Sequence, residues 1–264
     1  MDAVNHTPEV TAYLTRHALK HIVPLKVLSA YPQDAQSYYF SCGTSAGVLL
    51  LLPTRVTTYE SVRYPETQYV VVPCADSPAV TQQMLAYIPT NSSLIFKFMS
   101  EHDRAVIEQI FLLERVTSFL SYTCAGSARF TSAKPVIVSE RLDKQLLPLY
   151  RQNGYEQQEV EGYFDSGRAL SFALYENDQP LSACLAYQNH GAIWEICGLF
   201  TLHQARRKGY ARTVVETALN TLLTKKRIPR YQMDEKNLAS KQLAEDLGLS
   251  CFLRTEHYLH RTTK

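Results

Sequence analysis

The amino-acid sequence predicts an α/β protein made of two successive copies of one architecture. Strand-like runs alternate with segments of helical period in both halves, which is typical of a sheet with mixed strand directions and helices packed on it. Between the halves, residues 124–134 carry Gly126, Ser127 and Ser132, a composition typical of a linker. The length of 264 residues fits two domains of about 130 residues each. We therefore expect one domain at residues 1–128 and a second at residues 129–264.

The first half has a regular order of elements. Residues 7–21 have a helical pattern, and two β-rich runs on either side of residues 43–45 indicate a hairpin. Ser100, with Asp103 three residues later, approximates a helix-capping box. The predicted elements are a helix at 7–21, strands at 37–42, 46–53 and 69–72, a helix at 78–87, a strand at 94–98, a helix at 100–111 and a strand at 115–122.

The second half repeats this order with sharper boundaries. A long helix is predicted at 207–224, and Gly248 ends the helix that follows it. The full set is a strand at 136–138, a helix at 143–152, strands at 170–175, 181–187 and 193–201, a helix at 207–224, a strand at 230–233, a helix at 238–247 and two final strands within 249–261.

Composition excludes several classes of protein. Hydrophobic residues at 45% and charged residues at 20% indicate a globular chain with a real core. A formal net charge of +2 gives no global field for a nucleic acid or membrane partner. The longest apolar run, Val48 to Leu52, is too short to span a bilayer, and the N-terminus lacks a signal core, so we expect a cytoplasmic protein. The six scattered cysteines indicate reduced thiols, with no metal site.

The most informative segment is a basic turn between a strand and a helix. An apolar strand ends at Thr201, and Gly209 then lies just before an amphipathic helix. The first N–H groups of a helix have no internal partner, and the helix dipole adds positive potential there. Basic side chains at 206, 207, 208 and 212 add charge, so the segment predicts a diphosphate site. The alternative is a solvated basic helix start.

Two motifs then resemble those of one family. Arg206-x-x-Gly209-x-Ala211 resembles the acyl-coenzyme A signature of the GNAT superfamily of N-acetyltransferases, and residues 237–249 resemble its second motif. The resemblance covers about residues 134–264. Residues 73–78 of the first half have no basic turn, so a degenerate first copy is expected. The resemblance implies an α+β fold of two GNAT-like halves, each a mixed, mainly antiparallel twisted sheet flanked by helices.

The resemblance also implies which residues bind acetyl-CoA, the expected co-substrate. Main-chain amides of the basic turn would cradle the pyrophosphate of coenzyme A, and the end of the preceding strand would bind the acyl carbonyl and the pantetheine arm. Asn237 and Ser240 match positions that flank the pantetheine and thiol. The expected cofactor-binding residues are Leu199, Phe200, Thr201, Arg206, Arg207, Lys208, Gly209, Tyr210, Ala211, Arg212, Asn237 and Ser240.

Glu195 is the expected general base. It lies eleven positions before Arg206, where one branch of the family has a glutamate. A carboxylate on an apolar strand suits the removal of a proton from an ammonium group. The alternative is a strand glutamate that faces solvent or pairs with an arginine. Many family members have a tyrosine that protonates the thiolate where this chain has Ala244, so Tyr258 is a candidate acid.

These residues together predict an N-acyltransferase that moves an acetyl group to a primary amine of a small molecule, by direct attack in a ternary complex. The alternative function is a non-catalytic module that binds acyl-coenzyme A. Tyr38, Tyr39, Tyr163 and Tyr187 either line a pocket or pack in the core. The sequence leaves the acceptor amine and the oligomeric state open.

Overall fold

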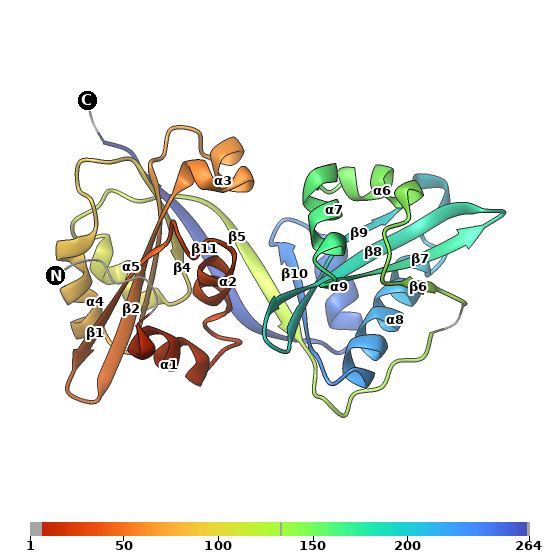
Figure 1. Cartoon of the computed structure of the whole chain (residues 1–264), viewed down its shortest axis with the longest axis horizontal. Coiled ribbons are helices and arrows are strands. Elements are labelled where there is room, and N and C mark those ends of the chain that lie inside the picture. The colour runs from red at the N-terminus through yellow and green to blue at the C-terminus, as the bar shows by residue number, and fades with distance from the viewer. Residues whose placement is uncertain (1–6, 133, 263–264) are drawn as a thin grey trace. The chain divides into compact units, whose positions relative to one another are not determined.

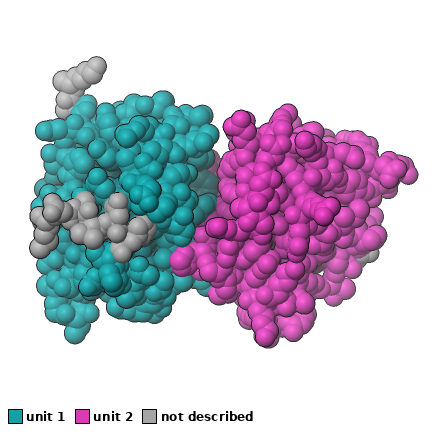
Figure 2. Space-filling model, in the orientation of Figure 1, with its two compact units in different colours: residues 1–120, 253–264 teal, residues 121–252 magenta. Residues whose placement is uncertain are grey.

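A computed structural model describes residues 7–132 and 134–262. The chain forms two compact units (Figure 2), of which unit 1 comprises residues 1–120 and 253–264 and unit 2 comprises residues 121–252. Strand β5 (Glu114–Thr123) begins in unit 1 and ends in unit 2, and β11 (Ser250–His260) begins in unit 2 and ends in unit 1. The end of the chain therefore belongs to unit 1 and not to the unit that precedes it in sequence.

Unit 1 is a mixed sheet with helices on both faces (Figure 1). Its strands are ordered β1-β2-β3-β4-β11, and β3 pairs with β4 in parallel whereas the other neighbours are antiparallel. Its elements are α1 (Pro8–Arg16), α2 (Ile22–Ala30), β1 (Gln36–Cys42), β2 (Ser45–Pro53), α3 (Thr58–Arg63), β3 (Tyr69–Ala75), α4 (Pro78–Met84), β4 (Leu94–Phe98) and α5 (Glu101–Ile107), with short 3-10 turns at Thr54–Val56 and Leu85–Tyr87.

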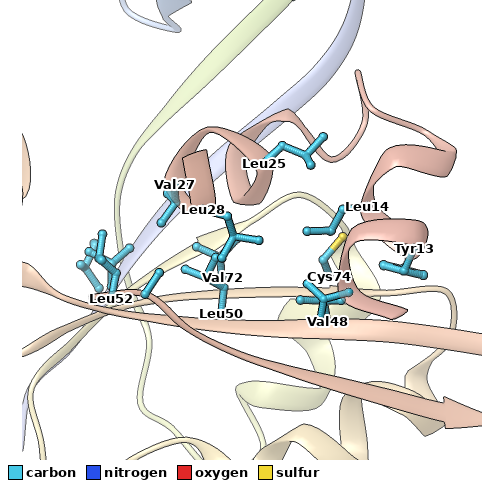
Figure 3. Packing of buried hydrophobic residues seen from close by; sticks show 14 of the residues in the cluster. Tyr13, Leu14, Leu25, Val27, Leu28, Val48, Leu50, Leu52, Val72 and Cys74 are labelled. Carbon is cyan, nitrogen blue, oxygen red and sulfur yellow. The ribbon is translucent and has the colours of Figure 1, made fainter. Parts of the chain in front are cut away.

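Alternating residues of β2 and β3 fill two cores on opposite faces of this sheet. Val48, Leu50 and Val72 pack under α1 and α2, and Figure 3 shows Leu25 and Leu28 of α2 above them. Leu49 and Val71, one residue out of step, pack instead with α4 and α5. The two-residue period of a strand thus explains why both faces of the sheet are covered by helices.

Unit 2 has a similar order of elements. Its strands are ordered β10-β9-β8-β7-β6, and only β9 and β10 pair in parallel among these neighbours. Its elements are β6 (Ile137–Ser139), α6 (Leu147–Arg151), α7 (Gln157–Asp165), β7 (Ala169–Glu176), β8 (Gln179–His190), β9 (Ile193–Thr201), α8 (Tyr210–Thr224), β10 (Ile228–Asp234) and α9 (Leu238–Asp246), with 3-10 turns at Lys144–Leu146 and His203–Ala205. The mixed, mainly antiparallel sheet flanked by helices is confirmed in both units.

Two sequence-based expectations about the elements are wrong. The predicted helix at 7–21 ends at Arg16, because the buried ring of His21 hydrogen-bonds the Leu14 carbonyl through Nδ1 at 3.1 Å and α2 begins only at Ile22. The last segment is one strand and not two. Residues 253, 255, 257 and 259 are buried in regular alternation, and no glycine or proline interrupts them.

The cysteines and helices bear on two further expectations. All six cysteines are free thiols. Within the described ranges, no helix combines the length and the apolar character needed to cross a membrane.

Candidate functional site

Strands β9 and β10 are paired over only part of their length. Their parallel register starts at Ile193 and Ile228 and ends at Ile196 and Tyr231. Beyond this pair β9 continues to Thr201 and β10 continues to Asp234, so the strands separate. We call this opening the fork, with Ile196 and Tyr231 at its closed end. The edge of β9 from residue 197 to residue 201 therefore has no strand partner on the side of β10.

A bulge in β9 determines which main-chain groups face the fork. Gly198 has a φ of +64°, and the pairing with β8 shifts by one residue there. The Leu199 carbonyl accepts a hydrogen bond from Asn153 Nδ2, and the Thr201 carbonyl accepts one from Arg206 Nε, both at 3.1 Å. Because the N–H and C=O of one strand residue point to the same side, the amides of Leu199 and Thr201 also face the fork.

The turn after β9 presents a row of unpaired donors. Within residues 7–132 and 134–262, the main-chain N–H groups of residues 207–212 donate no hydrogen bond, and the first helical bond runs from Thr213 N to the Gly209 carbonyl at 3.0 Å. Arg207 and Gly209 have left-handed φ values of +61° and +79°. Such a turn before a helix concentrates N–H groups around one point and adds the positive end of the dipole. We call residues 207–212 the nest.

The basic side chains around the nest do not all have the same role. Arg207 and Lys208 are exposed. The guanidinium of Arg212 is held by Glu216 Oε1 and by the Asp246 carbonyl, each at 3.0 Å, so it braces α8 against the end of α9. The guanidinium of Arg206 lies 5.5 Å from the centroid of the Phe200 ring. Tyr210 is buried and Ala211 is half-buried, so neither side chain blocks the nest from solvent.

Asn237 and Ser240 begin helix α9. The side-chain oxygen of Asn237 accepts a hydrogen bond from Ser240 N at 3.1 Å, which is a helix N-cap. Ser240 also lies near the Tyr231 hydroxyl, since it lowers the pKa of Tyr231 while burial raises that pKa to about 12. The structure thus gives Asn237 a capping role and places Ser240 beside the closed end of the fork.

Glu195 is buried in an ion pair. Its carboxylate lies 2.5 Å from Arg230 Nη1, and both side chains are almost fully shielded from solvent. Arg230 also donates to Ser121 Oγ at 3.1 Å through Nε. As an alternative to the general base, the sequence allowed a strand glutamate that either faces solvent or pairs with an arginine. The structure shows the pair with an arginine. Burial disfavours a charged carboxylate and the guanidinium favours it.

Three tyrosines surround Glu195 on its face of the sheet. The rings of Tyr163 and Tyr187 stack at 4.2 Å with an interplanar angle of 7°. Burial, with a smaller contribution from Glu195, raises the pKa of Tyr155, Tyr163 and Tyr187 above the usual range. These hydroxyls are therefore protonated at neutral pH. They form an aromatic wall between α7 and strands β8 and β9.

Three of the candidate residues belong to unit 1, whereas the fork and the nest belong to unit 2. Tyr258 lies in unit 1, where it pairs with Phe96 and its ring packs edge-on against Phe98 at 5.6 Å. Tyr38 is also in unit 1 and contacts Tyr87 instead of Tyr163. Tyr39, on the next position of β1, is 39% exposed. The part of the chain that the structure describes contains no group of three or more metal-ligating side chains.

With this geometry in place, comparison with known proteins assigns a family to the second half. Residues 140–249 match the Acetyltransferase (GNAT) family. Residues 140–249 form a GNAT domain. This range contains the fork, the nest and helix α9. No curated protein matches the chain significantly.

Solved structures extend the likeness of fold to nearly the whole chain. A Drosophila protein has a TM-score of 0.64 at 11% identity, with 96% of each chain covered. A GCN5-related N-acetyltransferase from Sphaerobacter thermophilus has a TM-score of 0.58 at 10% identity, covering 89% of this chain and 84% of that chain. A tandem GNAT protein from the clavulanic acid biosynthesis pathway has a TM-score of 0.53 at 8% identity, with 92% and 89% covered. At such identities the likeness shows the fold alone.

Two residues of the site were not predicted from the sequence. Arg230 and Tyr231 lie on β10, and only the register with β9 places them opposite Glu195 and Ile196. The one sequence signal was an arginine at the first position of the predicted strand 230–233, since an arginine buried in a sheet needs a charged or polar partner.

Proposed function

We propose that unit 2 is an N-acyltransferase that moves an acetyl group from acetyl-CoA to a primary amine of a small molecule. The observation that carries this proposal is the nest, where consecutive main-chain donors have no partner among the described residues. An ionised diphosphate satisfies such donors with charge-assisted hydrogen bonds. The GNAT domain at residues 140–249 supports acyl-coenzyme A as the source of that diphosphate.

The residues present fit an acyl-coenzyme A ligand. A Cβ placed on Gly209 would have no atom within 4 Å, so the space over the nest is open. The unpaired edge of β9 runs from the nest toward the closed end of the fork. Along this edge the amides of Leu199 and Thr201 are available to an extended arm that contains amide groups. In this proposal the main chain of residues 207–212 holds the diphosphate, and Leu199, Phe200 and Thr201 hold the pantetheine arm. The side chains of Asn153 and Arg206 then either release the Leu199 and Thr201 carbonyls or share them with the pantetheine arm.

In this proposal, the main chain of the fork and the side chains next to its closed end supply the remaining steps of an acyl transfer. Coenzyme A contributes an acyl group activated as a thioester. The Leu199 amide polarises the acyl carbonyl, and Glu195 accepts the proton of the ammonium group, directly or through a water. The wall formed by Tyr155, Tyr163 and Tyr187 borders Glu195, so we propose that the amine enters there.

The two halves differ in this proposal. We propose that residues 129–264 correspond to the acetyltransferase copy and residues 1–128 to a copy without a coenzyme A motif. In unit 1 the connection from β3 to α4 contains Asp76 and Ser77 and no basic residue. The negative charge of Asp76 in that position disfavours the binding of an anion such as the diphosphate of coenzyme A.

Calorimetric titration with coenzyme A tests the binding step. We expect one site per chain, and the Arg207→Ala/Lys208→Ala variant should bind at least about tenfold more weakly because it loses two charges beside the diphosphate. A matched control, Lys225→Ala/Lys226→Ala, removes the same charge from the other end of α8 and should bind normally. The absence of heat with the wild-type chain would refute the proposal.

Thiol release from acetyl-CoA with a panel of small amines tests transfer. Glu195→Gln should lower the rate at least about a hundredfold, within the usual contribution of a general base, while coenzyme A binds as before. If coenzyme A binds but no amine releases thiol, the chain is a binding module and the transferase proposal fails.

A further inference from the structure

We propose that β1 pairs with β1 of a second copy of this chain, so that the protein forms a symmetric dimer through the sheet edge of unit 1. The two strands run antiparallel about a twofold axis at Tyr39. β1 is the last strand of the sheet of unit 1 (Figure 1), and among the described residues no strand pairs with its outer side. The inference is independent of the proposed function, because it involves neither the nest nor the fork.

The sheet of unit 2 has one more strand at this place. In unit 1, β3 and β4 separate after a short parallel register whose last pair, Val71 with Phe96, closes a fork like that of unit 2. Following the registers outward from the two closed ends aligns β1 with β7. β6 covers β7 and runs antiparallel to it, whereas unit 1 has no counterpart of β6 among the described residues. The outer edge of β1 therefore corresponds to a position that an antiparallel strand fills in unit 2.

The hydroxyl of Ser37 lacks the partner that its counterpart in unit 2 has. The alignment puts Ser37 at the position of Ser171, whose Oγ donates to the Ser139 carbonyl of β6 at 3.4 Å. Ser37 is 3% exposed, and its Oγ forms no hydrogen bond among the described residues. A buried hydroxyl without a partner costs folding free energy. In the proposed pairing, Ser41 of the second copy lies opposite Ser37 on the same face and supplies this partner.

β1 also lacks the devices that normally keep a sheet edge from pairing. Natural edge strands are usually protected by a lysine, a proline, a bulge or a short length. From residue 35 to residue 53 the sequence has no charged side chain, and the register of β1 with β2 contains no bulge. β6, the edge strand of unit 2, has three residues and lies between Pro135 and Glu140. The chain therefore protects the edge of unit 2 and leaves the edge of unit 1 able to pair.

Alternate residues of β1 direct their main-chain groups to the outer side. Asp76 N donates to the Ala46 carbonyl at 2.9 Å, so Ala46 of β2 points toward β3, and the residues before and after it point toward β1. Through the register of β1 with β2, the odd-numbered residues of β1 then point away from β2. A twofold axis at the middle one of them lets each outward N–H meet a carbonyl of the second copy. These residues are Ser37, Tyr39 and Ser41.

The side chains of β1 match across the same axis. Tyr38 and Phe40 share the face on which Tyr87 packs, with centroids 5.0 and 5.2 Å from the Tyr87 ring. In the dimer, Tyr38 lies opposite Phe40 of the second copy in a non-hydrogen-bonded pair, where opposite side chains are closest. Because β1 has no charged residue, two identical strands pair without repulsion. This neutrality and the match about Tyr39 favour a second copy of this chain as the occupant.

Sedimentation velocity over a concentration series tests the dimer and its axis together. The wild type should dimerise, and Tyr39→Lys and Tyr39→Glu should each raise the dimer Kd at least about tenfold, because like charges then lie directly opposite. An equimolar mixture of these two variants should dimerise again, since the opposed charges are complementary. The control is Val138→Lys on β6, which adds the same charge at a side chain of similar exposure, 41%, and should leave the dimer intact.

Amide hydrogen exchange locates the contact. The amides of Ser37, Tyr39 and Ser41 should exchange at least about tenfold more slowly in the wild type than in Tyr39→Lys. A wild type that is monomeric at every concentration would overturn the inference, as would a Tyr39→Lys variant that dimerises like the wild type. Folded, monomeric Tyr39→Lys and Tyr39→Glu variants that stay monomeric when mixed would exclude the twofold pairing at Tyr39.

Discussion

The buried ion pair between Glu195 and Arg230 leads to a prediction that can be designed from the same chain, because unit 1 shows which residues occupy the corresponding positions. In unit 1 the residues at the corresponding register positions, one pair before the closed end of the fork, are Val70 and Ile95. Both are fully buried. The chain therefore shows which apolar residues fill these positions in a sheet of the same arrangement, and the double variant Glu195→Val/Arg230→Ile transfers that solution to unit 2.

The expected effects on stability differ between the single and the double variant. Arg230→Ile removes the guanidinium partner of a carboxylate that is 5% exposed, and breaking such a pair costs about 3–5 kcal/mol. Replacing both charges by apolar residues is typically neutral or stabilising by about 1–4 kcal/mol. The buried Ser121 hydroxyl loses the Arg230 bond, which costs about 1–3 kcal/mol. The double variant should thus unfold with a free energy close to that of the wild type.

The assay follows unit 2 through the single tryptophan of the chain. Trp194 precedes Glu195 on β9 and packs under Arg227, whose guanidinium lies 3.6 Å from the ring centroid. Its fluorescence during urea unfolding reports the free energy of unfolding of that unit. The double variant should keep the coenzyme A affinity, because the nest is unchanged, and lose acyl transfer. If it is as unstable as Arg230→Ile, or if it still transfers the acyl group, the pair has a structural role and the reasoning is wrong.

Two further predictions concern the nest and the pH dependence of unit 1. Gly209→Ala should weaken coenzyme A binding at least about tenfold in calorimetry, because the added Cβ projects into the open anion site. The control is Gly191→Ala, since Gly191 has a similar left-handed φ of +53° and equally open surroundings. Both variants should lose about 1 kcal/mol of stability, but Gly191→Ala should bind coenzyme A normally. Burial, and to a smaller extent Lys97, lowers the pKa of His257 to about 3, so the unfolded chain binds more protons than the folded one between about pH 6.5 and pH 3. The unfolding free energy of unit 1 should fall by about 1.4 kcal/mol per pH unit as the pH drops through this window, and His257→Asn should flatten that slope in acid titrations followed by circular dichroism. A wild-type profile that is flat between pH 6.5 and 5 would contradict this assignment.

Local signals were sufficient to predict the strand, turn and helix around the nest. The apolar run at 193–201 is β9, and Gly209 adopts the left-handed conformation that a turn before a helix needs. Ser100 caps α5 as its spacing with Asp103 predicted, with Asp103 N donating to Ser100 Oγ at 3.2 Å. These features depend on neighbouring residues, so a single sequence contains the information that fixes them.

Features that depend on distant residues were not predictable in the same way. The arginine partner of Glu195 lies 35 positions away and is placed by the register of β9 with β10. The last strand reads as part of the second half, but β11 ends in unit 1 and takes Tyr258 with it. Strand order and register are set by tertiary packing, so neither follows from residue spacing alone.

The two units differ in the turn that follows the first strand of each parallel pair, β3 in unit 1 and β9 in unit 2. In unit 1 the turn after β3 is closed by the chain itself, because the Asp76 carboxylate accepts hydrogen bonds from Ala46 N and the Tyr13 hydroxyl, each at 3.1 Å. In unit 2 the corresponding turn has main-chain donors at residues 207–212 that have no partner among the described residues, and the Glu195–Arg230 ion pair lies one register position before the closed end of the fork. Both features cost folding free energy, and at the register positions that correspond to Glu195 and Arg230 unit 1 has the apolar pair Val70 and Ile95. In the proposed function, an acyl-coenzyme A ligand supplies the partner of the turn, because its diphosphate would accept the hydrogen bonds of the main-chain N–H groups there.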